Sequence, residues 1–338
     1  MISLIPTSVE FIQAKTHGLR SRVYEHERLD ELCDLRSVGQ LWHRLYPDAT
    51  PGDHRELQRR LLADHVGALD GIRRFLPDAL APLYVWMMRR FQVENLKVLL
   101  RAWRAREPLA RVRPFLAPLA RDLELDAAAF LKAGGLADFL ALVPDAALRS
   151  AAEAGAAHYA DTGQTFFVEA ALDVAYYSGL VARQRALPAA HRAGTDALVG
   201  NEIAAYNILT VFRLKLNYGL PYEQAARFLA PGARHAAELD RLFAFPDFGD
   251  MVKLLPPDLL PRDGGRAIAT IADLERALWQ RILQVANRQF YHSVADLGAA
   301  VAFYTIKRVE LANLFHVVEG VRYGMAPGAI REGLIRPR

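Results

Sequence analysis

Apolar residues recur at intervals of three and four along most of this chain. The segment 94–103 illustrates the spacing, because four of its apolar residues fall on one helix face: Leu96, Leu99, Leu100 and Trp103. Alternating runs of β-branched residues are scarce, and no Asn-Gly or Asp-Gly turn lies between two such runs. The pattern therefore predicts an all-α protein.

Proline and glycine interrupt the helical pattern at several places. The main interruptions are residues 47–51, 108–118, 134–135, 187–188, 231–232 and 246–265. The three prolines in 108–118 exclude one straight helix there. The diproline 256–257 and the sequence Asp-Gly-Gly at 263–265 predict a loop or linker in 246–265. The helices between the interruptions are expected to pack as antiparallel bundles.

A short motif occurs three times, about 110 residues apart. It begins at Asn95, Asn207 and Asn313, and in each copy the first, fourth and fifth following residues are apolar. The sixth following residue is charged in every copy: Arg101, Arg213 and Glu319. An asparagine is unfavourable inside a helix, so we expect these three to have a structural use. Their amides would bind a neighbouring backbone or side chain between helices; the alternative is a chance recurrence at the solvent edge.

The surroundings of the motif extend the repeat. An amphipathic helix is predicted before each copy, over residues 56–69, 167–180 and 274–290. Gly219 and Gly324 end the helices of the last two copies, whereas the first copy has Arg106-Glu107-Pro108 and no glycine. We therefore predict three similar helical-bundle domains that span residues 1–121, 122–233 and 234–338.

The composition narrows the class of protein. Among 338 residues there are 42 Lys plus Arg and 38 Asp plus Glu, which gives a net charge of +4. So small an excess does not require a nucleic-acid partner. The single cysteine, Cys33, excludes an internal disulfide framework and a multi-cysteine metal site, and it suits a reducing cytoplasm.

Charge is unevenly distributed along the chain. Residues 89–121 contain nine basic and two acidic groups, whereas residues 122–169 contain eight acidic and two basic groups. Such segregation is typical of docking surfaces for charged partners, although two ordinary solvated faces would give the same pattern. The candidate docking residues are Arg101, Arg104, Arg106, Arg111 and Arg113.

Sequence motifs for common chemistries are missing. The chain has no Gly-x-x-x-x-Gly-Lys-Ser/Thr phosphate loop, no Gly-x-Gly-x-x-Gly after a strand, no His-Glu-x-x-His and no Gly-x-Ser-x-Gly. We therefore expect no catalytic residue, no cofactor and no metal. His65 and His316 lie among apolar helical residues and are expected to be hydrogen-bonded between helices.

No segment is predicted to cross a membrane. The most apolar stretches, 170–182 and 294–306, are shorter than the roughly 20 residues that a span requires, and they contain Asp173 and Asp296. The first residues have no basic region before an apolar core, so no secretory signal is expected. Any membrane contact would therefore depend on another molecule.

The repeated residues resemble a known family. Residues 94–101 are similar to the first-repeat helix of the C subunit of bacterial and archaeal V-type (A-type) ATPases, a family homologous to the d subunit of the eukaryotic vacuolar ATPase. Residues 169–177 resemble its second-repeat long helix. The stretch 310–334, which includes Asn313 and Tyr323-Gly324, resembles its closing signature.

The resemblance implies an all-helical funnel of three similar domains around a pseudo-threefold axis. The funnel would lie on the cytoplasmic face of the membrane as a peripheral part of the ATPase. One end would contact the membrane proteolipid ring and the other would accept the central axle subunits. The protein would transmit torque for ion transport coupled to ATP synthesis or hydrolysis, without catalysis or a cofactor of its own.

Two other functions stay open at this point. An all-α enzyme of the prenyl-transfer type would need clustered acidic residues, and no Asp-Asp-x-x-Asp run is present. A helical scaffold could instead bind nucleic acid or another acidic partner through residues 89–121. Few aromatic residues that could stack on bases, Trp103 and Phe115 among them, are interleaved in that stretch, and its binding would weaken steeply with salt.

Overall fold

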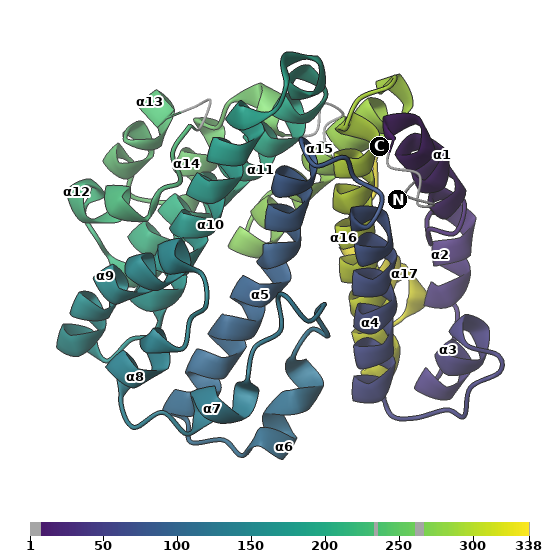
Figure 1. Cartoon of the computed structure of the whole chain (residues 1–338), viewed down its shortest axis with the longest axis horizontal. Helices are drawn as coiled ribbons and strands as arrows, with labels where there is room; N and C mark the ends of the chain where they lie inside the picture. Colours follow the sequence, from purple (N-terminus) through teal and green to yellow (C-terminus); the bar gives the residue numbers. More distant parts are fainter. Residues whose placement is uncertain (1–7, 233–235, 261–266, 338) are drawn as a thin grey trace, which may run out of the picture.

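The computed structural model describes residues 8–232, 236–260 and 267–337. Within these ranges the regular structure is entirely helical, without a strand (Figure 1). The sequence-based prediction of an all-α fold is therefore confirmed. No helix within the described ranges is long and apolar enough to cross a membrane.

The helices fall into three successive groups. The first comprises α1 (Val9–Arg20), α2 (His26–Cys33), α3 (Val38–Leu45), α4 (His54–Arg73), α5 (Ala81–Arg104), α6 (Leu109–Val112) and the 3₁₀ turn η1 (Arg113–Phe115). The second comprises α7 (Ala127–Leu131), α8 (Leu136–Ala141), α9 (Ala146–Thr162), α10 (Phe166–Ala186), α11 (Ala189–Tyr218), α12 (Tyr222–Ala225) and η2 (Ala226–Phe228). The third comprises α13 (Ala236–Leu239), η3 (Arg241–Ala244), α14 (Phe248–Lys253), η4 (Pro257–Leu259), α15 (Ile271–His292), α16 (Gly298–Arg322) and α17 (Pro327–Gly333).

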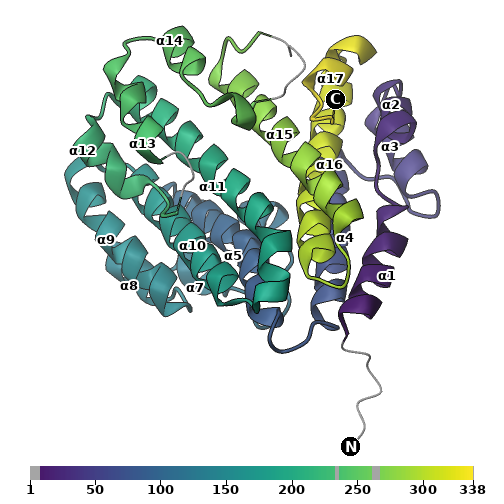
Figure 2. The ribbon, with the colours of Figure 1, turned by 90° about the horizontal axis from the view of Figure 1, so that it is seen from above.

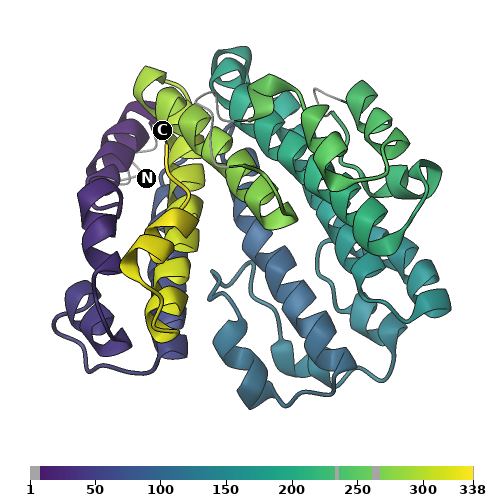
Figure 3. The same cartoon turned by 180° about the vertical axis from the view of Figure 1, so that it is seen from behind.

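Each group contains one pair of long consecutive helices, and we call these pairs the first, second and third hairpins: α4–α5, α10–α11 and α15–α16. The second helix of each hairpin packs against the first helix of the next one, so α5 contacts α10 and α11 contacts α15. The contact of α16 with α4 closes the cycle. Figures 1 and 2 show α16 beside α4, and Figure 3 shows the same helices from behind.

Large aromatic side chains fill the space between the hairpins. Trp86 of α5 donates a hydrogen bond from its indole nitrogen to the carbonyl oxygen of Tyr176 in α10, at 2.7 Å. Tyr304 of α16 donates its hydroxyl proton to the carbonyl oxygen of Met87 in α5, also at 2.7 Å. These side chains are almost fully buried. Because buried indole and phenol groups need polar partners, the two bonds fix α5 against both neighbouring hairpins.

The three hairpins end in the same backbone conformation. Gly219 and Gly324 adopt left-handed φ values of 65° or slightly less, as expected for helix C-caps. In the first hairpin Arg106 adopts φ 55° at the corresponding place. The next residue, Glu107, returns a backbone hydrogen bond to Ala102, as Met325 does to Gly320. The first copy therefore departs from the third in sequence but not in this backbone geometry, and the second copy shares the left-handed residue.

The segment 246–265 is more ordered than the predicted loop or linker. Helix α14 and turn η4 lie within it. They form because Met251, Leu255 and Leu259 bury their side chains against α11 and α15 in a second hydrophobic cluster. The prediction of a simple loop was wrong for this part, and residues 261–265 lie outside the described ranges.

His65 differs from its expected role. The Nε2–H of His316 donates a hydrogen bond to the carbonyl oxygen of Ile330 at 3.0 Å, as predicted. His65 on α4 is 2% exposed, and neither of its ring nitrogens has a hydrogen-bond partner among the residues that the structure describes. Its ring instead lies edge-on to Phe91. Burial, together with the nearby positive charges of Lys307 and Arg308, holds the pKa of His65 well below its usual range.

We predict that His65 makes the protein less stable in acid. In the unfolded chain a histidine binds its proton near pH 6.5, whereas folded His65 stays neutral to lower pH. The unfolded state is therefore favoured as pH falls below about 6.5, by up to about 1.4 kcal/mol per pH unit. Urea unfolding should show that the free energy of unfolding falls less between pH 7 and pH 5 in His65→Leu than in the wild type. The exposed control His292→Gln should behave as the wild type, and an equal loss in His65→Leu would contradict the prediction.

Candidate functional site: charged seams between the long helices

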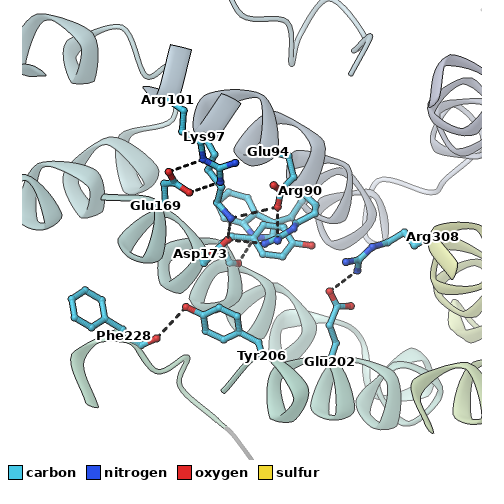
Figure 4. Close-up of polar contacts among 12 residues, drawn as sticks. Arg90, Glu94, Lys97, Arg101, Glu169, Asp173, Glu202, Tyr206, Phe228 and Arg308 are labelled. Atoms are coloured by element: carbon cyan, nitrogen blue, oxygen red, sulfur yellow. Dashed lines mark hydrogen bonds and ion pairs between the residues drawn. The ribbon is translucent and has the colours of Figure 1, made fainter. Parts of the chain in front are cut away.

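The contact between one hairpin and the next is called a seam here, and two of the three seams contain buried ion pairs (Figure 4). In the seam between α5 and α10, Asp173 accepts hydrogen bonds from Arg90 at 2.8 Å and from Lys97 at 2.6 Å. Glu94 pairs with the same two cations. The side chains of Arg90, Lys97 and Asp173 are at most 17% exposed. This cluster therefore joins the first and second hairpins by charges that water barely reaches.

A second buried pair joins the second and third hairpins. Arg308 of α16 donates a hydrogen bond to Glu202 of α11 at 2.6 Å. The Arg308 guanidinium also lies over the rings of Trp279, 4.8 Å away, and Tyr304, 5.7 Å away. Nearby, Tyr206 of α11 donates its hydroxyl proton to the carbonyl oxygen of Phe228 at 3.0 Å.

The positions of these charges follow the repeat. Arg90, Glu202 and Arg308 each lie five residues before the repeated asparagine of their own hairpin. The charged residue six positions after each asparagine also contacts the next hairpin. The three bonds that they form are Arg101 to Glu169, Arg213 to Glu275, and Glu319 to the amide of Gln58. The same helix positions thus serve all three seams, with charge pairs in two and a neutral amide in the third.

Three ionisable groups of the seams, Arg90, Glu94 and Arg308, are held in their charged forms. Burial alone would lower the pKa of Arg90, but the carboxylates of Glu94 and Asp173 outweigh it and raise that pKa well above its ordinary value. Burial likewise favours the neutral form of Glu94, yet Arg90 and Lys97 keep its pKa below the ordinary value. The pKa of Arg308 is raised by Glu202 against the effect of burial. Groups so firmly charged at neutral pH suit a structural network rather than proton transfer.

Each repeated asparagine binds both polar groups of one distant backbone unit. The Asn95 amide donates to the carbonyl oxygen of Ala117 at 2.9 Å and accepts from the Ala117 N–H at 2.7 Å. Asn207 makes the same two bonds with Ala230, at 3.0 and 2.7 Å. Asn313 makes them with Ile335, at 2.8 Å each. In all three places the partner follows the short helix after the hairpin, so the amide fastens that segment back onto the long helix.

The five candidate docking arginines are all exposed at the end of α5 and in the segment that follows. Arg101 is bound to Glu169 across the seam, and Arg111 lies 3.5 Å from Glu107. Arg104, Arg106 and Arg113 have no ion pair with any residue that the structure describes. Part of the predicted docking surface is therefore used within the chain.

The seam charges were not identified from the sequence. Arg90, Asp173, Glu202 and Arg308 read as ordinary helix residues, because their partners lie on other helices. An alignment of the three copies would have shown that the residue five positions before each asparagine is charged in every copy. In the described part of the chain, no group of three or more histidine, cysteine or acidic residues is placed to hold a metal ion.

Comparison with known proteins agrees with the resemblance found in the sequence. The model of the ATP synthase (C/AC39) subunit family matches residues 12–333. A protein described as the C subunit of an A-type ATP synthase, from Methanosphaera stadtmanae, is 21% identical over 339 residues, which cover 95% of this chain and 86% of that protein. The family match includes all three repeated asparagines and both charged seams. This chain therefore belongs to the ATP synthase (C/AC39) subunit family.

Proposed function

We propose that the chain is a non-catalytic adaptor in the central stalk of a rotary V/A-type ATPase. It connects the central axle subunits to the membrane proteolipid ring on the cytoplasmic face and transmits torque between ATP chemistry and ion transport. The family match over residues 12–333 is the observation that carries this proposal. The chain contributes no catalytic residue and needs no cofactor for this role.

We further propose that the protein consists of three similar domains, 1–121, 122–233 and 234–338, around a pseudo-threefold axis. The cyclic contacts among the three hairpins support this arrangement. So do the three asparagines with equivalent backbone partners. A closed cycle of packed helices resists twisting because close-packed interiors have low compressibility. Stiffness of this kind is what a torque-transmitting part requires.

The nucleic-acid alternative receives less support from the structure. Of the nine basic residues in 89–121, four form ion pairs with acidic residues of the second group of helices. These are Arg89 with Asp145, Arg90 and Lys97 with Asp173, and Arg101 with Glu169. Charges that are neutralised within the chain release few counterions from a polyanion and add little affinity for it.

Affinity purification tests the proposed role. The tagged chain would be expressed in its own cells, and the membranes would be solubilised in a mild detergent. We expect the tagged chain to recover the proteolipid, the axle subunits and the catalytic subunits together, and the isolated chain to hydrolyse no ATP. Recovery of none of these subunits, or ATP hydrolysis by the pure chain, would contradict the proposal.

A further inference from the structure

Arg106 is an arginine in a backbone conformation that favours glycine. Its φ of 55° lies in the left-handed region, where a side chain with a Cβ atom is disfavoured. The corresponding positions of the other two hairpins, Gly219 and Gly324, are glycine. Because glycine adopts this conformation without strain, the hairpin itself offers no reason for the arginine. His26 and Ala295 also adopt positive φ values, so the surroundings of the Arg106 side chain, rather than its φ value alone, indicate a use outside local folding.

Arg106 lines a hollow between the C-terminal end of α5, the end of α7 and the segment that follows α7; Figure 1 shows α5 and α7 side by side there. The hollow has a volume of about 440 Å³. Its lining includes Trp103, Arg104, Arg106, Glu107, Gly134 and Tyr159. The Trp103 indole nitrogen already donates to the carbonyl oxygen of Ala133 at 2.9 Å. The two guanidinium groups and the Tyr159 hydroxyl are therefore side-chain donors in the lining that could face a ligand, and only the guanidinium groups carry positive charge.

The positive charges of Arg104 and Arg106 are not balanced by acidic groups among the residues that the structure describes. Neither Arg104 nor Arg106 has an ion pair with any described residue, and both are exposed. The one carboxylate in the described lining, Glu107, lies 3.5 Å from Arg111. A guanidinium group binds a carboxylate with two parallel hydrogen bonds. The hollow therefore offers two guanidinium groups to an acidic ligand.

The walls of the hollow favour a short acidic protein segment over a long polyanion. Several walls, among them Gly134 and Tyr159, belong to the stretch 122–169, in which acidic residues outnumber basic ones by eight to two. Two guanidinium groups can pair with one or two carboxylates. They neutralise too few phosphates to hold a long polyanion beside that stretch.

We infer that Arg104 and Arg106 form a docking site for an acidic segment of a protein partner in the assembled ATPase. The inference rests on the proposed function, because it assumes that the chain works inside that complex. To the proposed function it adds the chemistry of one contact, in which carboxylates of the partner bind the two guanidinium groups. It also singles out Arg106 as the residue whose side chain is kept for binding rather than for folding.

The test compares folding and docking in the same variants. Arg106→Gly removes the charge and relieves the backbone, whereas Arg106→Gln removes the charge alone. The matched control is Arg36→Gln, at another exposed arginine with no ion pair among the described residues. Thermal unfolding of each full-length chain and its release from washed membranes by increasing salt would be measured. Arg106→Gly should melt about 1 °C or more above the wild type.

Both Arg106 variants should nevertheless bind the complex about 3- to 10-fold more weakly and leave the membranes at lower salt. Arg36→Gln should be released from the membranes at the same salt concentration as the wild type. The inference is overturned if both Arg106 variants stay bound as firmly as the wild type, or if Arg106→Gly melts lower. It is also overturned if the wild type binds a short duplex DNA and Arg106→Gln does not. Absence of the wild type from the complex would overturn the proposed function as well, whereas unchanged variants overturn this inference alone.

Discussion

The substitution Asp173→Asn is expected to lower the free energy of unfolding by about 3–5 kcal/mol. The carboxylate of Asp173 faces both Arg90 and Lys97, and all three side chains are largely buried. Removing it leaves two cations beside Glu94 alone, in a place where water cannot replace the lost charge. Urea denaturation followed by helical circular dichroism measures the change.

A control separates this effect from the loss of any ion pair. Glu275 and Arg213 join α15 to α11 at 2.9 Å, but both side chains are 44% exposed. Because exposed pairs contribute little, Glu275→Gln should cost about 1 kcal/mol or less. Equal losses for Asp173→Asn and Glu275→Gln would show that burial of the first seam does not govern its strength.

The substitution Asn207→Ala is expected to lower the free energy of unfolding by about 2–4 kcal/mol. Asn207 is 1% exposed, and its amide satisfies both the N–H and the carbonyl oxygen of Ala230. Alanine leaves two buried backbone groups without partners, and each such group costs about 1–3 kcal/mol. The same denaturation experiment measures the loss.

Two further variants make the asparagine prediction specific. Asn217 lies on the same helix but is exposed, so Asn217→Ala should change the stability by less than about 0.5 kcal/mol. Asn313→Ala should cost less than Asn207→Ala, because the hydrogen bonds between Asn313 and Ile335 are only partly buried, whereas those between Asn207 and Ala230 are buried. If Asn207→Ala costs no more than Asn217→Ala, the two hydrogen bonds of Asn207 do not stabilise the fold.

Local sequence patterns were sufficient to predict the helical class and the places of the long helices. The spacing of apolar residues predicted helices at 56–69, 167–180 and 274–290, and the structure has longer helices over each of these ranges. Capping explains part of the difference: Asp53 and Thr270 accept hydrogen bonds from the first turns of α4 and α15, before the apolar pattern begins. The first residues of these helices depend on single capping side chains rather than on the spacing of apolar residues.

Contacts between distant helices were beyond the reach of local patterns. The sequence marked Arg101 as a candidate for docking, but Glu169, far along the chain, binds it. It likewise indicated that His65 would be hydrogen-bonded, although no polar group in the described part of the chain bonds to the ring. In both cases the outcome depends on which side chain the neighbouring helix presents. The first repeat was obscured for a different reason, since Arg106 takes a conformation that glycine normally marks.

The seams suggest how the chain would carry a twisting load. Two seams hold buried charge pairs whose strength depends on geometry, and the third replaces the outer charge pair by the amide of Gln58 against Glu319, at 2.8 Å. A directional bond opposes sliding of one helix along another more than apolar contact does. On the proposed function, the closed cycle of seams keeps the three hairpins turning as one body.

The most direct test of the adaptor role is ion pumping by the reconstituted ATPase with and without this chain. The complex without the chain should keep ATP hydrolysis by its catalytic subunits and lose ATP-driven ion uptake into vesicles. Adding back the wild-type chain should restore the uptake, and adding Asp173→Asn should restore it only below its own unfolding temperature. Ion uptake that is undiminished without the chain would contradict the account.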